Sequence, residues 1–264
     1  MTWPRVYKAP LDFGMASRIS HLTSMVNVLV LGGTGPTGLA LIEEALSRGH
    51  TVIIFARSPQ KLPDSILQNP RVAIVKGSLE DEDAITRAFE TRIPNDDHNG
   101  QRESAHPSEV IKVDVVVSAL GPPVTKIHPA GNPLARGYEK FIHVARRKGV
   151  TRFIVLGTAS ITDEHDRSDL KFQSLVFGVK YFAPRAYAEL VEIGKVFGKS
   201  DDLEWTIVRI PVLVSHEGGE YHAGYIGDGR TTAVLTRPLF AKFVFDECDA
   251  RAWIQKRPLV SWAS

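Results

Sequence analysis

Apolar runs rich in β-branched residues alternate along the chain with segments of helical periodicity. Six runs predict strands: residues 26–31, 51–55, 71–75, 113–118, 152–156 and 205–210. Four helical patterns lie between or after them: residues 37–48, 81–90, 134–148 and 186–198. Continuously apolar strands such as VDVVVSAL are typical of a sheet that helices cover on both faces. The pattern therefore predicts an α/β fold, a Rossmann-type doubly wound parallel sheet of about six or seven strands.

The chain shows no internal repeat or linker, so residues 25–264 are predicted to form a single domain. Residues 1–24 are interpreted as an N-terminal extension or an alternative start before Met25. This segment is mildly basic, but its prolines interrupt the amphipathic helix that a transit peptide needs. Residues 91–110 are polar and aperiodic, which predicts a long surface loop.

A glycine-rich turn joins the first predicted strand to the first predicted helix. Gly32, Gly35 and Gly38 form a G-x-x-G-x-x-G pattern at this junction. Gly32 suits the tight turn, Gly35 the approach of a pyrophosphate, and Gly38 the close packing of helix on strand. Free N–H groups and the helix dipole favour a phosphate there. The alternative is a bare turn with no ligand.

The end of the second strand carries arginine where a dinucleotide site often has an acidic residue. Its sequence is VIIFARSPQKL, so no carboxylate is available for a ribose 2′-hydroxyl. Arg57 can instead bind a 2′-phosphate, with Ser58 and Lys61 as helpers. The alternative is a solvated surface arginine. The predicted cofactor is therefore NADP rather than NAD.

Composition excludes several classes of partner. The chain of 264 residues is 43% hydrophobic and 23% charged, with a formal net charge of +2, which is too mild for a nucleic-acid partner. No apolar run of about 18 residues is present, so no membrane partner is predicted. The single cysteine, Cys248, is consistent with a cytoplasmic protein without disulfides. No metal site is predicted, because the acidic segment around His165 has no ligand spacing. A small molecule remains the expected partner, and the oligomeric state stays open.

Six stretches in the same order resemble one family. They are the glycine turn, FARSPQKL, VKGSLED, DVVVSALGP, RFIVLGTAS and LEWTIVRIPVL, and they are similar to the NmrA-like branch of the atypical short-chain dehydrogenase/reductases. This branch includes NADPH-dependent flavin and biliverdin reductase-like proteins. The resemblance covers most of residues 26–261 and implies a small C-terminal cap on the substrate side of the Rossmann domain.

The resemblance also implies which residues contact the cofactor. The pyrophosphate cradle would consist of Gly32, Thr34, Gly35, Pro36, Thr37 and Gly38. Arg57 would bind the 2′-phosphate. Ser78 and Leu79 would flank the adenine. The ribose would be lined by Ala119, Leu120 and Gly121. The nicotinamide would be bordered by Thr158, Ala159 and Ser160, with Pro211 and Val212 opposite.

The catalytic motif of the wider family is missing. Short-chain dehydrogenases typically use Tyr-x-x-x-Lys, in which the lysine lowers the pKa of the tyrosine. Here Arg185 stands four residues after Tyr181, and Val191 stands four after Tyr187. The candidate proton donors are therefore Tyr187, Tyr181 and Ser160, beside water or a substrate hydroxyl. His128, His216 and His222 are interpreted as surface histidines.

Three functions fit these observations. The first is an NADPH-dependent reductase that transfers hydride to a small carbonyl, quinone, enone or flavin-like substrate. The second is a non-catalytic NADP-binding regulator, a role also found in the NmrA-like branch. The third is a non-redox isomerase or dehydratase on the same scaffold.

Overall fold

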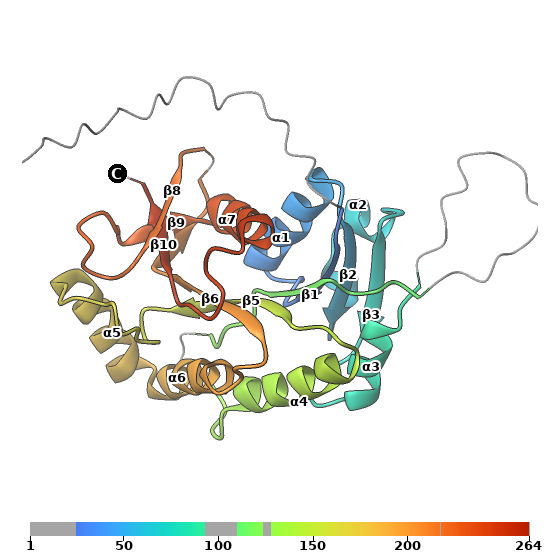
Figure 1. Ribbon diagram of the computed structural model, residues 1–264, viewed down its shortest axis with the longest axis horizontal. Helices are drawn as coiled ribbons and strands as arrows, with labels where there is room; N and C mark the ends of the chain where they lie inside the picture. Colours follow the sequence, from blue (N-terminus) through green and yellow to red (C-terminus); the bar gives the residue numbers. More distant parts are fainter. Residues whose placement is uncertain (1–24, 93–109, 124–127, 217, 264) are drawn as a thin grey trace, which may run out of the picture.

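The computed structural model describes residues 25–92, 110–123, 128–216 and 218–263. The predicted N-terminal extension and most of the predicted loop over residues 91–110 lie outside the described residues. Within these ranges, one sheet has the strand order β3-β2-β1-β4-β5-β6-β10-β8 (Figure 1). The strands are β1 (Asn27–Leu31), β2 (Thr51–Ala56), β3 (Val72–Lys76), β4 (Val115–Ser118), β5 (Arg152–Thr158), β6 (Glu204–Ile210), β8 (Tyr221–Gly224) and β10 (Leu259–Trp262).

The sheet is doubly wound, as predicted. Every neighbouring pair is parallel except β8 and β10, which run antiparallel. The strand order changes direction between β1 and β4, because β2 and β3 lie on one side of β1 and the later strands on the other. In folds of this kind, the connections after the two strands at such a point lead in opposite directions. The crevice between them, at the carboxyl ends of the strands, is where ligands bind.

Helices cover both faces of this sheet. They are α1 (Pro36–Ser47), α2 (Asp64–Leu67), α3 (Glu82–Phe89), α4 (Pro133–Arg147), α5 (Leu170–Phe182), α6 (Pro184–Gly198) and α7 (Arg237–Ala250). In Figure 1, α1 and α7 lie on one side of the sheet and α3, α4 and α6 on the other. Val28 and Val30 pack in the core beneath α1 and α7, whereas Leu29 and Leu31 pack in the core beneath α3, α4 and α6. Alternate residues of each strand thus supply two separate cores.

The C-terminal part, for which the resemblance implied a small cap, also contributes to the central layers of the fold. Helix α7 packs against α1, and Leu259 and Val260 of β10 are fully buried in the main sheet. Strands β7 (Val212–Val214) and β9 (Val234–Thr236) form a separate two-stranded parallel sheet. The last third of the chain therefore extends the central sheet and also covers one face of it.

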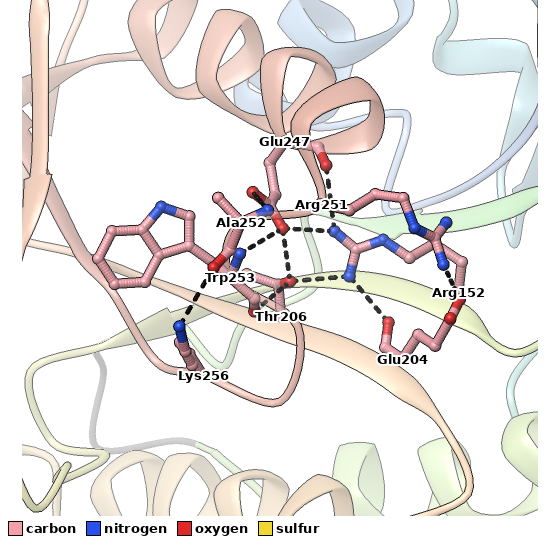
Figure 2. A network of polar contacts seen from close by, with 8 residues as sticks. All are labelled: Arg152, Glu204, Thr206, Glu247, Arg251, Ala252, Trp253 and Lys256. Atoms are coloured by element: carbon pink, nitrogen blue, oxygen red, sulfur yellow. Dashed lines mark hydrogen bonds and ion pairs between the residues drawn. The ribbon is translucent and has the colours of Figure 1, made fainter.

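A buried polar network ties α7 to the sheet (Figure 2). Arg152 of β5 donates to a carboxylate oxygen of Glu247 at 2.8 Å, and both side chains are almost fully buried. Glu247 also accepts hydrogen bonds from the backbone N–H groups of Ala252 and Trp253, each at 3.0 Å. Because these N–H groups follow α7, the carboxylate fixes the end of that helix against β5 and β6.

Candidate cofactor and active site

The glycine turn occupies the junction of β1 and α1. Gly32 has a φ of +78°, which favours glycine over residues with a side chain. A Cβ on Gly38 would lie 2.1 Å from the carbonyl oxygen of Gly32, so the helix passes too close to the turn for any side chain. A Cβ on Gly35 would meet nothing nearer than 3.8 Å. The structure thus gives Gly32 and Gly38 the conformational roles predicted for them.

The N-terminus of α1 is suited to an anion. Gly35 is its N-cap residue, no side chain caps the helix, and its first turn contains no acidic residue. The first N–H groups of a helix have no acceptor within the helix, and the dipole makes this end positive. A phosphate group fits such a position better than any neutral group does.

A cleft of about 750 Å³ opens beside this turn at the carboxyl edge of the sheet. Seven residues predicted to contact the cofactor line it: Gly32, Thr34, Arg57, Ser78, Leu79, Leu120 and Gly121. Arg57 and Lys61 bring positive charge to its lining, beside Ser58 and a single acidic residue, Glu80. The volume falls in the range of small-molecule sites, and the positive charge fits a phosphate. The residues present therefore fit a phosphorylated dinucleotide.

The structure does not bring all predicted contacts to this cleft. Gly35, Pro36, Thr37 and Gly38 form the turn and the start of α1, beside the lining rather than in it. Thr158 is the last residue of β5, and Ala159 follows it. Pro211 follows β6, and Val212 begins the next strand. These four, together with the half-buried Ala119, are not among the residues that line the described cleft. Their assignment to the nicotinamide and ribose stays a prediction.

The three predicted proton donors lie in different surroundings, and none lines the described cleft. Ser160 is buried, with 4% of its surface exposed. Tyr181 is exposed on α5, where its ring stacks on Phe177. Tyr187 is half-buried in the first turn of α6, and the Lys180 ammonium lies 5.7 Å from the centre of its ring.

A histidine and glutamate pair in the cleft wall was not predicted. His128 lines the cleft, and its Nε2 lies 2.8 Å from a carboxylate oxygen of Glu189 on α6. The other oxygen of Glu189 accepts the backbone N–H of Ala135 in the first turn of α4 at 2.8 Å. Arg185 donates to the His128 carbonyl at 3.3 Å. The position of His128 after the fourth strand was the only signal in the sequence, because 61 residues separate it from Glu189.

Hydrogen bonds hold the loop after β4 from beneath. The hydroxyl groups of Ser118 and Tyr138 lie 2.6 Å apart, and Ser118 Oγ also accepts the N–H of Leu120 at 3.2 Å. Burial raises the pKa of the Tyr138 phenol well above its ordinary value. Tyr138 therefore stays protonated and positions the loop that carries Leu120 and Gly121.

Within the described residues, no group of three or more His, Cys, Asp and Glu side chains is arranged to hold a metal ion. Likewise, none of the helices in the described ranges is long and apolar enough to cross a membrane.

A parallel sheet with a glycine turn at its switch point and a cationic cleft beside it defines a Rossmann-type dinucleotide-binding protein. The sequence agrees, since the model of the NAD(P)H-binding family matches residues 32–250. The chain belongs to this family of NAD(P)H-binding proteins, in agreement with the resemblance described above.

Two curated relatives are similar over part of the chain. A 2-alkyl-3-oxoalkanoate reductase of Stenotrophomonas maltophilia is 26% identical over 204 residues, which are 74% of this chain and 53% of the relative. A 3 beta-hydroxysteroid dehydrogenase/Delta 5→4-isomerase of Mycobacterium tuberculosis is 28% identical over 144 residues, 54% of this chain and 34% of the relative. The chain thus spans about half or less of the length of these relatives.

Solved structures share the fold. A short-chain dehydrogenase/reductase of Veillonella parvula in complex with NADP superimposes with a TM-score of 0.65 at 15% identity, covering 89% of this chain and 94% of the other. ChuY, an anaerobillin reductase of Escherichia coli O157:H7, gives a TM-score of 0.61 at 16% identity, covering 90% and 97%.

Proposed function

We propose that the protein is an NADPH-dependent reductase that transfers hydride to a small carbonyl, quinone, enone or flavin-like substrate. The observation that supports it most is the cleft beside the glycine turn, with Arg57 and Lys61 in its lining. Membership of the family indicates that the cofactor is NAD(P)H, and two of the relatives are a reductase and a dehydrogenase/isomerase. The preference for NADP over NAD rests on Arg57.

The cofactor preference is tested by titration. Wild-type protein is expected to bind NADPH more tightly than NADH, and Arg57→Ala should remove most of that difference. Loss of a charge-assisted pair to the 2′-phosphate corresponds to about 2 kcal/mol, or more than about tenfold in affinity. Arg87→Ala is the matched control, because Arg87 is an exposed arginine on α3 outside the cleft. Equal affinity of the wild type for both cofactors would contradict the proposal.

In the mechanism, the bound cofactor supplies hydride, and the chain supplies position and a proton. The turn at Gly32 and Gly38 and the N-terminus of α1 orient the pyrophosphate, while Arg57 anchors the adenosine end. Holding the hydride donor and the substrate together can lower the activation barrier by about 7 kcal/mol or more in well-oriented systems. Since Tyr-x-x-x-Lys is missing, positioning is proposed as the main source of rate.

The proton donor is proposed among the residues nearest the reacting groups. Tyr181, Tyr187 and Ser160 do not line the described cleft, whereas His128 does, with Glu189 to orient its ring. A carboxylate that accepts a hydrogen bond from an imidazole fixes the orientation of the ring. His128 is therefore added to the candidates, beside water and a substrate hydroxyl.

Turnover separates the reductase from the alternatives. A panel of quinones, flavins, enones and aromatic ketones should give NADPH oxidation above background with at least one class. Tight NADP binding without any turnover would favour the non-catalytic regulator or a non-redox enzyme, which the missing tyrosine motif also allows.

A further inference from the structure

Helix α5 exposes large apolar side chains on its outer surface. The exposed fractions are 79% for Leu170, 67% for Phe177, 71% for Tyr181 and 63% for Phe182. Figure 1 shows α5 at the edge of the molecule, with α6 beside it. Scattered single apolar residues on a surface are ordinary, but a group of four on one short helix indicates an interaction site.

Three of these four residues, Leu170, Phe177 and Tyr181, form a stripe together with Ser174 because of their spacing. Leu170, Ser174, Phe177 and Tyr181 follow one another at intervals of four, three and four residues, which places them on one face of the helix. The opposite face is fixed to the molecule by Phe172, which is buried in a cluster with Ala159. The helix therefore presents its stripe outward and cannot turn it inward without losing that anchor.

Lysine side chains border the stripe on both sides. At 3.6 residues per turn, Lys171 and Lys180 project on opposite flanks of the line from Leu170 to Tyr181. The side chain of Lys171 is 56% exposed, and its ammonium lies 3.6 Å from a carboxylate oxygen of Asp169 and donates to the Thr231 carbonyl at 3.1 Å. The other oxygen of Asp169 accepts the N–H of Lys171 as the N-cap of the helix. No Asp or Glu lies between Leu170 and Phe182, so Lys180 contributes most of the net positive charge beside the stripe.

We infer that this stripe docks on the surface of an anionic phospholipid membrane. Aromatic and leucine side chains enter the boundary between headgroups and acyl chains, while lysines beside them reach the phosphates. Each lysine near an anionic surface strengthens binding, and the attraction weakens with salt. Peripheral docking needs no spanning helix, so it is compatible with the finding on the described helices. It departs from the expectation of no membrane partner, which rested on the lack of a spanning run.

A second copy of the chain fits the stripe less well. Two α5 helices paired through the same face would bring two Lys180 side chains to the contact with no carboxylate between Leu170 and Phe182 to offset them, whereas each Lys171 is paired with Asp169. Like charges at such a contact oppose association, whereas the same lysines favour an anionic lipid surface.

The test is sedimentation of the full-length protein with vesicles of phosphatidylcholine alone and of phosphatidylcholine mixed with phosphatidylserine. Wild-type protein should bind the mixed vesicles, bind the neutral ones much more weakly, and be released by salt. The double variant Leu170→Ser/Phe177→Ser should bind the mixed vesicles at least about tenfold more weakly, because it removes much of the apolar contact. Lys180→Glu should weaken binding about fivefold or more.

Leu67→Ser is the matched control, because Leu67 is an exposed leucine on α2, a separate helix. It should bind vesicles as the wild type does, and the thermal unfolding of each variant reports whether it is folded. No binding by the wild type, or equal binding by the double variant, overturns the inference. A dimer in sedimentation equilibrium that the double variant dissociates overturns it in favour of a second copy. NADPH is absent from these assays, so their failure is distinguishable from failure of the proposed reductase activity.

Discussion

At the scale of single residues, function depends on a few positions whose backbone or surroundings admit little change. Gly38 lies so close to the Gly32 carbonyl that its lack of a side chain is a condition for the turn. His128 and Cys248 show a second effect, in which neighbours far along the chain decide what a side chain can do. Each of the three gives a testable expectation.

Gly38→Ala should destabilise the fold and weaken NADPH binding together. The added methyl group would force the turn and α1 apart, which corresponds to about 1–3 kcal/mol and a fall in Tm of several degrees. Thermal unfolding and NADPH titration measure the two effects. Gly178→Ala on α5 is the control, since no atom of the described residues lies within 4 Å of its Cβ position. It should leave Tm unchanged or raise it slightly, because alanine favours a helix.

His128→Gln and Tyr187→Phe distinguish the candidate acids once a substrate is found. Loss of a general acid typically lowers kcat by about 10² or more, whereas a residue that only packs changes it less than about tenfold. We expect the larger loss for His128→Gln, with a changed pH profile of kcat, and the smaller one for Tyr187→Phe. A loss of about 10² for Tyr187→Phe would instead identify that phenol as the acid.

Cys248 should be inert in the native protein. Burial raises the pKa of its thiol to about 12, so almost no thiolate exists near pH 8. A thiol reagent such as DTNB should therefore react with the native chain much more slowly than with the chain in urea. Rapid reaction of the folded protein would contradict this account of its surroundings.

At the scale of elements, α7 shows how a helix distant in sequence becomes part of the cofactor-binding half of the molecule. It packs on α1, the helix that begins at the glycine turn, and it is fixed at its other end by the network around Glu247. The side chains that hold it come from β5 and β6, and the segment after the helix adds two backbone N–H groups (Figure 2).

Glu247→Ala should destabilise the protein strongly. It leaves the Arg152 guanidinium buried without its carboxylate, and loss of one partner of a buried pair typically corresponds to about 3–5 kcal/mol. Urea unfolding measures this change. Glu204→Ala is the control from the same network, because Glu204 pairs with Arg251 at the surface and both side chains are 40% exposed or more. Its effect should stay below about 1 kcal/mol.

At the scale of the whole molecule, carboxylates in separate parts of the fold set its stability in acid. Partial burial raises the pKa of Asp228, but hydrogen bonds from His222 and the N–H groups of Arg230 and Thr231 outweigh it and lower the pKa to about 2. The pKa values of Asp166 and Asp246 are also lowered, by Arg209 in the first case and by Lys242, Tyr221 and Arg48 in the second, against the effect of burial.

These carboxylates should make the protein less stable as the pH falls from about 4 towards 2. Their pKa values are lower in the folded chain than in the unfolded one, so their contribution is complete above the unfolded value of about 3.9 and is lost on protonation. Urea unfolding at several pH values should show this loss, and Asp228→Asn should reduce it. Asp201→Asn, which replaces an exposed aspartate, is the matched control and should leave the dependence of the unfolding free energy on pH unchanged. If Asp228→Asn also leaves it unchanged, the assignment is contradicted.

The sequence by itself determined the order of β1 to β6, the helices α1, α3, α4 and α6, the glycine turn and the arginine that follows β2. These features depend on local rules, because the two-residue period of a strand and the steric demands of Gly32 and Gly38 act between near neighbours. The apolar runs therefore predicted six of the strands within a few residues, and Arg57 follows directly from the position of β2.

Only the tertiary structure decided how distant segments meet. The pairing of His128 with Glu189, the packing of α7 on α1 and the addition of β10 to the sheet each join residues tens to hundreds of positions apart. Helix α5 is apolar enough in sequence to have been buried, yet the anchoring of Phe172 turns its stripe outward. The physical reason is that distance along the chain does not determine which residues bury apolar surface together or form ion pairs. These partners are fixed only when the helices and strands pack.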